Sequence, residues 1–445
     1  MNINPIFKYI IFFQTIIYTQ SYTLNDCIHI AIEGKKTVLS SELDVLSSYK
    51  GLISSYSSFL PSVQVSSGIG RTYFPELENY NIDFEKLTID TTRSNFYSNY
   101  NAGIYLNQKI YDGGRSLNQI KKAKIALEIS KYNQRLKKIE VIQNVIRSYY
   151  GLLQAEKLLD VSEKNLEMSI QQVAFVKKQF DLGVVKKTDL LKAEVAQGQA
   201  KVDMLSKKSN FQNARRILFN DMGLQDFGQE ITTAENEWAV PIIPSSSDIL
   251  NKLKEWNPSL LISKAQTRLN EFTYKDIKGL RLPSLNTSVN YSANSETGLE
   301  LIDSFKDNWS LGMNLSISLP IYSGNALSIQ QQQAKLLKQK SDYTYITLLN
   351  NLRVQAELIR ETLTNYAEII PLNQSVVKSA KEDLKLAKER YGLGSATILE
   401  ILDAQISLIS SNSNLINAVH DARIQEANLK ALLGILDTEY KIKEE

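Results

Sequence analysis

The chain has 445 residues, of which 43% are hydrophobic and 22% charged, so it can bury a large core and is not a disordered chain. Its 51 Lys and Arg nearly balance 48 Asp and Glu, which argues against a nucleic-acid partner. One cysteine, Cys27, and two histidines, His29 and His420, are too few for a disulfide framework or a zinc or copper site. We therefore expect no metal and no cofactor.

Residues 1–21 have the pattern of a secretory signal peptide. Lys8 precedes an apolar stretch over residues 9–18, and small residues follow it. A buried N-terminal helix is the alternative, but no other stretch is as continuously apolar. Cys27 lacks the preceding small residues that lipid transfer would require, so we expect a buried thiol. No other apolar run approaches 18 residues, which excludes a helical membrane protein.

The sequence contains an internal repeat in two copies. Residues 110–113 recur as 321–324, and residues 180–183 recur as 391–394, both at a shift of 211 positions. Such self-similarity indicates two copies of one structural unit. Upstream the shift is 222, because the first copy has extra residues, and we assign them to a polar loop over residues 76–93.

Each copy is predicted to contain a helix, a β-hairpin and two long helices. The boundaries of the first copy are residues 22–223, with helices at about 24–59, 115–180 and 187–221 and strands at about 62–74 and 96–110. After a linker over 224–247, the second copy covers 248–436, with helices at about 248–280, 326–391 and 396–434 and strands at about 284–294 and 308–321. A tail covers residues 437–445.

The predicted strands alternate strictly. From Ser310 to Ile321 every odd position is apolar, and the even positions are mostly Ser, Gly and Asn. Segments of about ten residues with one apolar face are typical of a transmembrane β-barrel. A sheet that covers a soluble core is the ordinary alternative. The signal peptide and the long helices favour the barrel.

The long helices carry heptads. Apolar residues recur every seven positions, which specifies left-handed coiled-coil packing; the series is Leu363, Ile370, Val377, Leu384 and Tyr391.

The two hairpins supply only four strands for a barrel. A closed barrel needs about eight or more strands, and open edges are not tolerated in lipid. Several chains must therefore close one barrel.

Taken together, this order of elements resembles the TolC-type outer-membrane efflux protein family, most specifically over residues 180–193 and 390–404. The resemblance implies a homotrimer whose chains share one transmembrane β-barrel, surrounded by outer-membrane lipid and continued by a periplasmic α-helical tunnel of coiled coils. It implies an exit duct in a tripartite efflux or type I secretion system, with a periplasmic adaptor (membrane fusion) protein and an inner-membrane transporter as partners.

By the same resemblance, the turns between the long helices are hairpin tips that dock the adaptor. The candidate docking residues are Leu182, Gly183, Thr188, Leu393, Gly394 and Thr397. A tip needs a residue with positive φ, which glycine supplies, and the threonines can cap the returning helices. Any helical hairpin has these needs, so a purely structural role stays open.

Three carboxylates follow the tips. Glu400 and Asp403 are three residues apart on one helix face, and Asp189 is the repeat partner of Glu400. In a trimer they would form an acidic ring at the tunnel aperture, as the resemblance implies. Acidic residues near a helix start also stabilise the helix dipole, so that role stays open. Ser395-Ala396 replaces a basic residue found in some relatives, and we expect no salt-bridge lock there.

An enzyme is excluded, because no Ser/His/Asp arrangement or phosphate-binding glycine loop is present. The remaining alternative is an extended coiled-coil scaffold or adhesin whose strands form a small soluble sheet. The basic cluster between Lys121 and Lys138 would then indicate a nucleic-acid or lipid patch, although a solvated helix face is the usual explanation.

Overall fold

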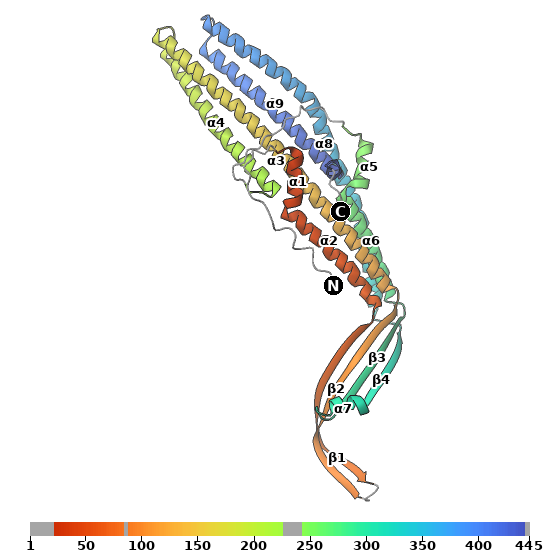
Figure 1. Cartoon of the computed structure of the whole chain (residues 1–445). Coiled ribbons are helices and arrows are strands. Elements are labelled where there is room, and N and C mark those ends of the chain that lie inside the picture. Colours follow the sequence, from red (N-terminus) through yellow and green to blue (C-terminus); the bar gives the residue numbers. More distant parts are fainter. Residues whose placement is uncertain (1–21, 84–87, 226–242, 441–445) are drawn as a thin grey trace. The chain divides into compact units, whose positions relative to one another are not determined.

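The computed structural model describes residues 22–83, 88–225 and 243–440 (Figure 1). The expected signal peptide, most of the linker and residues 441–445 of the tail lie outside the described residues. The chain divides into two compact units. One comprises Met1–Leu43, Tyr132–Leu261 and Ile346–Glu445, and the other comprises Asp44–Lys131 and Ile262–Tyr345. Within the described ranges, none of the helices combines the length and the apolar character needed to cross a lipid bilayer.

The second unit is built on one antiparallel sheet (Figure 1). Its strands are β1 (Ser62–Asp83), β2 (Thr88–Asp112), β3 (Ser284–Ser295) and β4 (Trp309–Ser318). They lie in the order β1-β2-β3-β4, so the hairpin of each repeat copy contributes two adjacent strands. In the part of the chain that the structure describes, β1 and β4 are the edges of this sheet.

The polar loop expected over residues 76–93 is wrong. The first hairpin continues through most of it, with Leu77 paired to Ser94 and Asp83 paired to Thr88. The register shifts between Tyr73 and Leu77, across Pro75, whose nitrogen cannot donate to the ladder. Backbone pairing therefore continues where the alternation of apolar and polar residues has ended.

Cross-strand neighbours divide the sheet into two faces of different chemistry. One register row consists of Val63, Leu106, Val289 and Met313, and the next row consists of Ser62, Asn107, Ser288 and Asn314. Because successive side chains point to opposite faces, these two rows lie on opposite sides of the sheet. One face is apolar and the other carries hydroxyl and amide groups.

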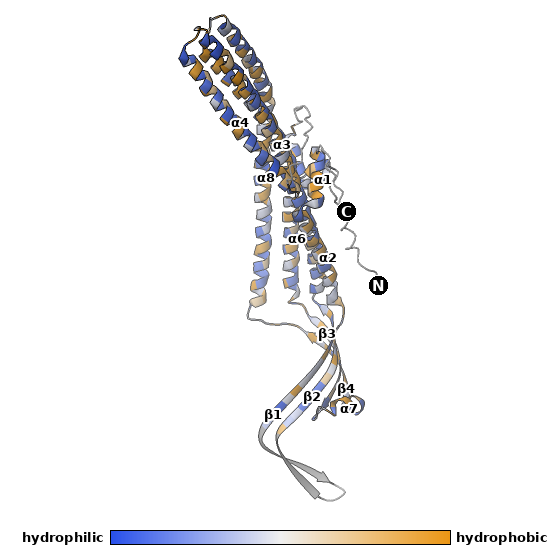
Figure 2. Ribbon diagram, turned by 60° about the vertical axis from the view of Figure 1, so that its left-hand side comes forward, coloured by the Kyte–Doolittle hydropathy of each residue, from blue (hydrophilic) through white to orange (hydrophobic). Residues whose placement is uncertain are grey.

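Helices lead into and out of the sheet. They are α2 (Lys36–Ser55) with the short 3-10 helix η2 (Tyr56–Phe59), α3 (Arg115–Asp181), α6 (Pro258–Gly279) and α8 (Ala326–Gly392). In Figure 2 three of these helices are seen from left to right as α8, α6 and α2, above the strands. Helices α3 and α8 each have 67 residues, as the sustained heptads lead one to expect.

The first helix of each copy is two helices rather than one. In the first copy α1 (Leu24–Gly34) ends before Lys35, and in the second α5 (Ser246–Trp256) ends before Asn257. Asn257 Oδ1 accepts a hydrogen bond from the Leu260 amide at 2.9 Å, and Pro258 opens α6. Proline is well tolerated in the first turn of a helix, where its missing amide costs no hydrogen bond, so Pro258 fits the start of α6. The single helices expected over 24–59 and 248–280 are corrected accordingly.

In the other unit the long helices turn back as α4 (Lys187–Met222) and α9 (Ile398–Leu433), with the short α10 (Leu436–Glu439) after the latter. Its main core surrounds α1, where Ile142, Ile146 and Leu152 of α3 pack with Leu218 and Met222 of α4. Cys27 is fully buried in this core, which confirms the expectation of a buried thiol. The β3–β4 connection contains a further short helix, α7 (Leu301–Asp307), which the sequence did not predict.

Candidate functional site

The apolar face of the sheet is exposed. Val65 and Ile69 on β1 are 74% and 75% exposed, and Met313 on β4 is 76% exposed. A sheet that covers a soluble core buries this face, and a contiguous exposed apolar surface marks a contact with lipid or protein. The sheet therefore presents a surface for an apolar environment outside the chain.

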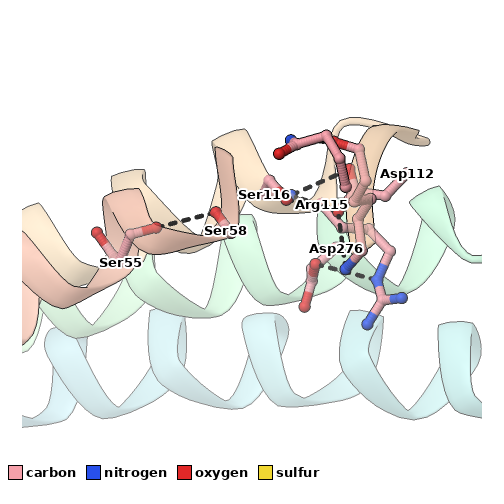
Figure 3. Close-up of polar contacts among 8 residues, drawn as sticks. Ser55, Ser58, Asp112, Arg115, Ser116 and Asp276 are labelled. Carbon is pink, nitrogen blue, oxygen red and sulfur yellow. Dashed lines mark hydrogen bonds and ion pairs between the residues drawn. The ribbon is translucent and has the colours of Figure 1, made fainter. Parts of the chain in front are cut away.

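The junction between β2 and α3 is tied to α6 (Figure 3). The Asp112 carboxylate accepts hydrogen bonds from the Ser116 amide at 3.0 Å and from the Ser116 hydroxyl at 2.7 Å, so it caps α3. The Asp276 carboxylate of α6 lies 2.9 Å from Lys122 Nζ and 3.6 Å from Arg115 Nε, with Asp276 and Lys122 largely buried. This ion cluster fixes α3 against α6 beside the sheet.

The close packing of this junction requires glycine. Gly113 has a φ of +71°, and a Cβ built on it would overlap the carbonyl oxygen of Gly279 in α6. At the equivalent junction after β4, Gly324 has a φ of +61° and nothing lies within 4 Å of its Cβ position. Among the described residues, the first junction is closely packed at its glycine and the second is not.

The hairpin tips share one backbone geometry. Gly183 and Gly394 have φ values of +76° and +72°, which confirms the positive φ expected at both tips. The Gly183 amide donates to Phe180 O at 2.8 Å and the Val184 amide to Gln179 O at 2.9 Å, the bonding pattern of a Schellman motif. Gly394 and Ser395 donate to Tyr391 O and Arg390 O in the same way. The two exposed leucines, Leu182 and Leu393, are 79% and 84% exposed.

The helix starts after the tips differ. Thr397 caps α9 as expected, accepting from the Glu400 amide while the Glu400 carboxylate accepts from the Thr397 amide. Thr188 does not cap α4, and the expectation was wrong, because α4 begins at Lys187 and its N-cap is Lys186, which makes no side-chain cap bond. Lys186 is the position 211 residues before Thr397, so Thr188 lies two residues too far along.

The three aperture carboxylates have different surroundings. Glu400 Oε1 accepts from the Thr397 amide at 3.1 Å, and Glu400 Oε2 lies 3.3 Å from Arg390 Nη1. Asp189 is half-buried in the first turn of α4. Asp403 is exposed and makes no hydrogen bond or ion pair with the residues the structure describes. Glu400 therefore serves its own helix, and Asp403 is the carboxylate that remains available.

Sequence reasoning missed Arg390. The Arg390 guanidinium also donates from Nη2 to Ser395 O at 3.2 Å, so it holds the tip from the preceding helix rather than from positions 395–396. Its position one residue before Tyr391 was a usable signal, because a basic side chain in the last helical turn reaches the free carbonyls.

The two hairpins pack on each other just below the tips. Val176 and Ala193 of the first hairpin bury against Tyr391, Ile398 and Ile401 of the second. Burial raises the pKa of the Tyr391 phenol, with the Asp189 carboxylate as a second cause. Gln405 Nε2 also donates to Asn165 Oδ1 at 2.7 Å, which joins α9 to α3.

A separate hollow of about 630 Å³ lies between α3, α4 and α9, with Leu191, Val195 and Ile406 among its lining. Among the described residues, no group of three or more His, Cys, Asp or Glu side chains is placed to hold a metal ion.

Known proteins are similar to this chain in sequence and in fold. The family described as outer membrane efflux protein matches residues 28–224 and 249–435. Outer membrane protein TolC of Escherichia coli (strain K12) is 25% identical over 379 residues, which cover 79% of this chain and 74% of TolC. Alkaline protease secretion protein AprF of Pseudomonas aeruginosa is 21% identical over 421 residues, covering 93% of this chain and 85% of AprF.

A crystal structure of CusC has the same fold, with a TM-score of 0.80 at 18% identity and 92% of each chain covered. The family match extends over most of the chain and agrees with the resemblance seen in the hairpin-tip motifs. The chain therefore belongs to the outer membrane efflux protein family.

Proposed function

We propose that this protein is the outer-membrane exit duct of a tripartite efflux or type I secretion system, through which substrate passes from a periplasmic adaptor and an inner-membrane transporter to the exterior. As a member of its family it resides in the bacterial outer membrane, and the family is one of channels rather than enzymes. The observation that carries the proposal is the two-faced sheet, which is apolar and exposed on one side and polar on the other.

The open sheet supports a barrel shared among chains. Both β1 and β4 are edges in the described part of the chain, and unpaired edges in hydrocarbon are too costly to persist. In a homotrimer β4 of one chain pairs with β1 of the next, and three chains supply 3 × 4 = 12 strands. That number exceeds the roughly eight strands of the smallest closed barrels. The polar face then lines the lumen and the apolar face contacts lipid.

The helices beside the two sheet edges support the same assembly. On α2, the exposed apolar side chains include Leu46, Tyr49 and Ile53, and on α8 they include Leu336 and Tyr343. These side chains follow heptad-like spacings that the chain leaves uncovered. In a trimer α8 of one chain lies beside α2 of the next, and the helices continue the barrel as a periplasmic tunnel.

The hairpin tips are the proposed contact with the adaptor. Leu182 and Leu393 offer exposed apolar side chains on a rigid Schellman turn, which is a suitable surface for a helical partner. The name of one relative refers to secretion of a protease, so the proposal includes secretion as well as efflux.

The aperture proposal now rests on Asp403. Its exposed carboxylate recurs three times around the axis of a trimer, which would attract cations at the tunnel mouth. Glu400 is held by Thr397 and Arg390 and would contribute mainly through those contacts. Asp189 would add a second, half-buried carboxylate from each chain.

The test is single-channel conductance of the purified protein in planar bilayers. We expect cation-selective channels whose selectivity falls in Asp403→Asn, with a smaller change in Glu400→Gln. Glu163→Gln, an exposed carboxylate on α3 outside the tips, is the matched control and should leave selectivity unchanged.

If the Asp403→Asn channels have the same selectivity as the wild type, the exit-duct function stands and the acidic aperture is refuted. A protein that stays in solution without detergent and forms no channels would instead favour the coiled-coil scaffold.

A further inference from the structure

Helix α7 lies on the apolar face of the sheet. The Tyr291 ring centroid is 5.7 Å from that of Phe305 in α7 and 5.5 Å from that of Trp309, and the Tyr291 hydroxyl donates to Phe305 O at 3.0 Å. Tyr291 is in register with Ile104 and Leu311, which belong to the apolar face. The helix is therefore fixed to the side of the sheet that we assign to lipid.

Two further contacts agree with this placement. Gly298, just before α7, lies against the Tyr100 ring, and a Cβ on Gly298 would be 3.1 Å from it. Tyr100 pairs with Ile69, on the same apolar face. Ala293, the neighbour of Trp309 in the register, is only 1% exposed, whereas most apolar-face residues of β1 and β4 are open. The connection covers the end of β3.

The exposed side of the β3–β4 connection is amphipathic. Leu299, in the turn just before α7, is 92% exposed, and Ile302, in the first turn of α7, is 75% exposed. Beside them the Asp303 carboxylate lies 3.2 Å from Lys306 Nζ, and both charged side chains are more than 70% exposed. Two bare aliphatic side chains next to an exposed ion pair are typical of a helix that lies at the boundary between lipid and water.

We propose that α7 is an interfacial helix that rests in the outer leaflet of the outer membrane, with Leu299 and Ile302 at the start of the acyl chains and Asp303 and Lys306 at the level of the headgroups. This rests on the proposed function, since α7 meets lipid only if the apolar face of the sheet does. Its partner is a lipid surface, because α7 lies on the same face of the sheet that exposes Val65, Ile69 and Met313.

The position of α7 predicts how deeply the sheet is inserted in the membrane. The β3–β4 hairpin ends at Ser295 and Trp309, where α7 connects it, whereas the β1–β2 hairpin remains paired as far as Asp83 and Thr88. If α7 marks the outer surface of the bilayer, the extra length of the first hairpin projects beyond that surface. Helix α7 then acts as a stop that sets how deeply the barrel is inserted.

The experiment measures the depth of single cysteines in the full-length protein reconstituted into liposomes. Cys27 need not be removed, because it is fully buried and burial raises the pKa of its thiol to about 12. Ile302→Cys, Met313→Cys and Leu393→Cys each carry an environment-sensitive fluorophore. Met313 lies in mid-strand on the apolar face, and Leu393 lies at the hairpin tip. Lipids with a nitroxide at the headgroup, high on the acyl chain or deep on the acyl chain quench the fluorescence.

We expect the label at position 302 to be quenched most by the shallow acyl nitroxide, as for a helix buried about 5–10 Å into the interface. The label at 313 should be quenched most by the deep nitroxide, and the label at 393 should not be quenched. A label at 302 that no lipid quenches, while the label at 313 is quenched, would overturn the role of α7 and leave the duct intact.

Two other results are equally decisive. Shielding of the label at 302 from both lipid and aqueous iodide would mean that a second copy of the chain covers α7, and it would also overturn the proposal. If the label at 313 is not quenched by any lipid, the proposed membrane-spanning function itself fails.

Discussion

The two strand-to-helix junctions occupy equivalent positions in the repeat and are packed in opposite ways. After β2, Asp112 caps α3, and Asp276 of α6 holds both Arg115 and Lys122. After β4, the corresponding positions carry Ser323 and Ala326, and the turn at Gly324 is exposed. One junction is completed within the chain, and the other is left open.

The difference teaches that duplication alone does not make the copies equivalent. The hairpin of the first copy ends at the central strand β2, where α6 of the second copy supplies the ion-pair partner Asp276. The hairpin of the second copy ends at β4, an edge strand among the described residues, where the proposed trimer would place a neighbouring chain. We expect contacts at this edge to form during assembly, and substitutions at the two junctions to have unequal effects.

The largest effect is expected for Gly113→Ala. Its Cβ would overlap Gly279 O, and its φ of +71° disfavours any residue with a Cβ, so we expect a loss of stability of more than about 3 kcal/mol. Gly324→Ala has the same backbone strain but open space, so it should cost roughly 1 kcal/mol. Thermal melting of the purified proteins in detergent measures both. Equal losses would show that the first junction is not more tightly packed.

The next effect is expected for Asp276→Asn. Removal of this carboxylate leaves the largely buried Lys122 ammonium and the Arg115 guanidinium without their counter-charge, which should cost about 2 kcal/mol. Ser54→Ala, at the equivalent position of α2, is the control and should change stability little. The comparison of the junctions would be weakened if the Asp276→Asn variant melted like the wild type.

A smaller effect should separate the two tips. Thr397→Ala removes the capping box of α9 and should destabilise the protein by about 1 kcal/mol. Thr188→Ala should be close to neutral, because Thr188 does not cap α4. Lys186→Ser, which introduces a capping hydroxyl at the true N-cap, should stabilise α4. Chemical denaturation curves for the three variants test this order, and a costly Thr188→Ala would contradict it.

The smallest effect concerns Asp421, whose repeat partner 211 residues earlier is Asn210. Burial raises the pKa of the Asp421 carboxyl, so the folded state favours the neutral form. That contribution is present at low pH and is lost as the pH rises through the raised pKa. Asp421→Asn should therefore raise the melting temperature at pH 7 by on the order of 1 °C and have no effect near pH 3. A gain that is independent of pH would have another cause.

The sequence predicted the elements whose signal is periodic. Heptads in α3 and α8 and the alternation in β4 are repeated many times, so a single irregular residue does not hide them. The extension of the β1–β2 hairpin was missed because its residues do not alternate, although the backbone pairs regardless of side chains. Helix α7 was missed because seven residues are too few to show a period.

Only those features of the candidate site that depend on residues adjacent in the sequence could be predicted. The glycines at the tips follow from the turn itself, and their positive φ values are confirmed. Thr188 does not cap α4 because the position equivalent to Thr397 in the repeat register is Lys186. The ion pair between Lys122 and Asp276 joins residues 154 positions apart, and no local pattern announces such a contact.

The helix starts after the two tips have a consequence for symmetry. Both tips have the same backbone turn, but the next helix begins with Lys186 and Lys187 after one tip and with Thr397 and Ile398 after the other. In the proposed trimer six similar turns would face the periplasm, and turns followed by two lysines would alternate with turns that lack them. A partner that senses only shape would find six equivalent positions, whereas a partner that senses charge would find three. In the proposed trimer, a few side chains beside each turn would therefore decide whether a partner distinguishes the two kinds of tip.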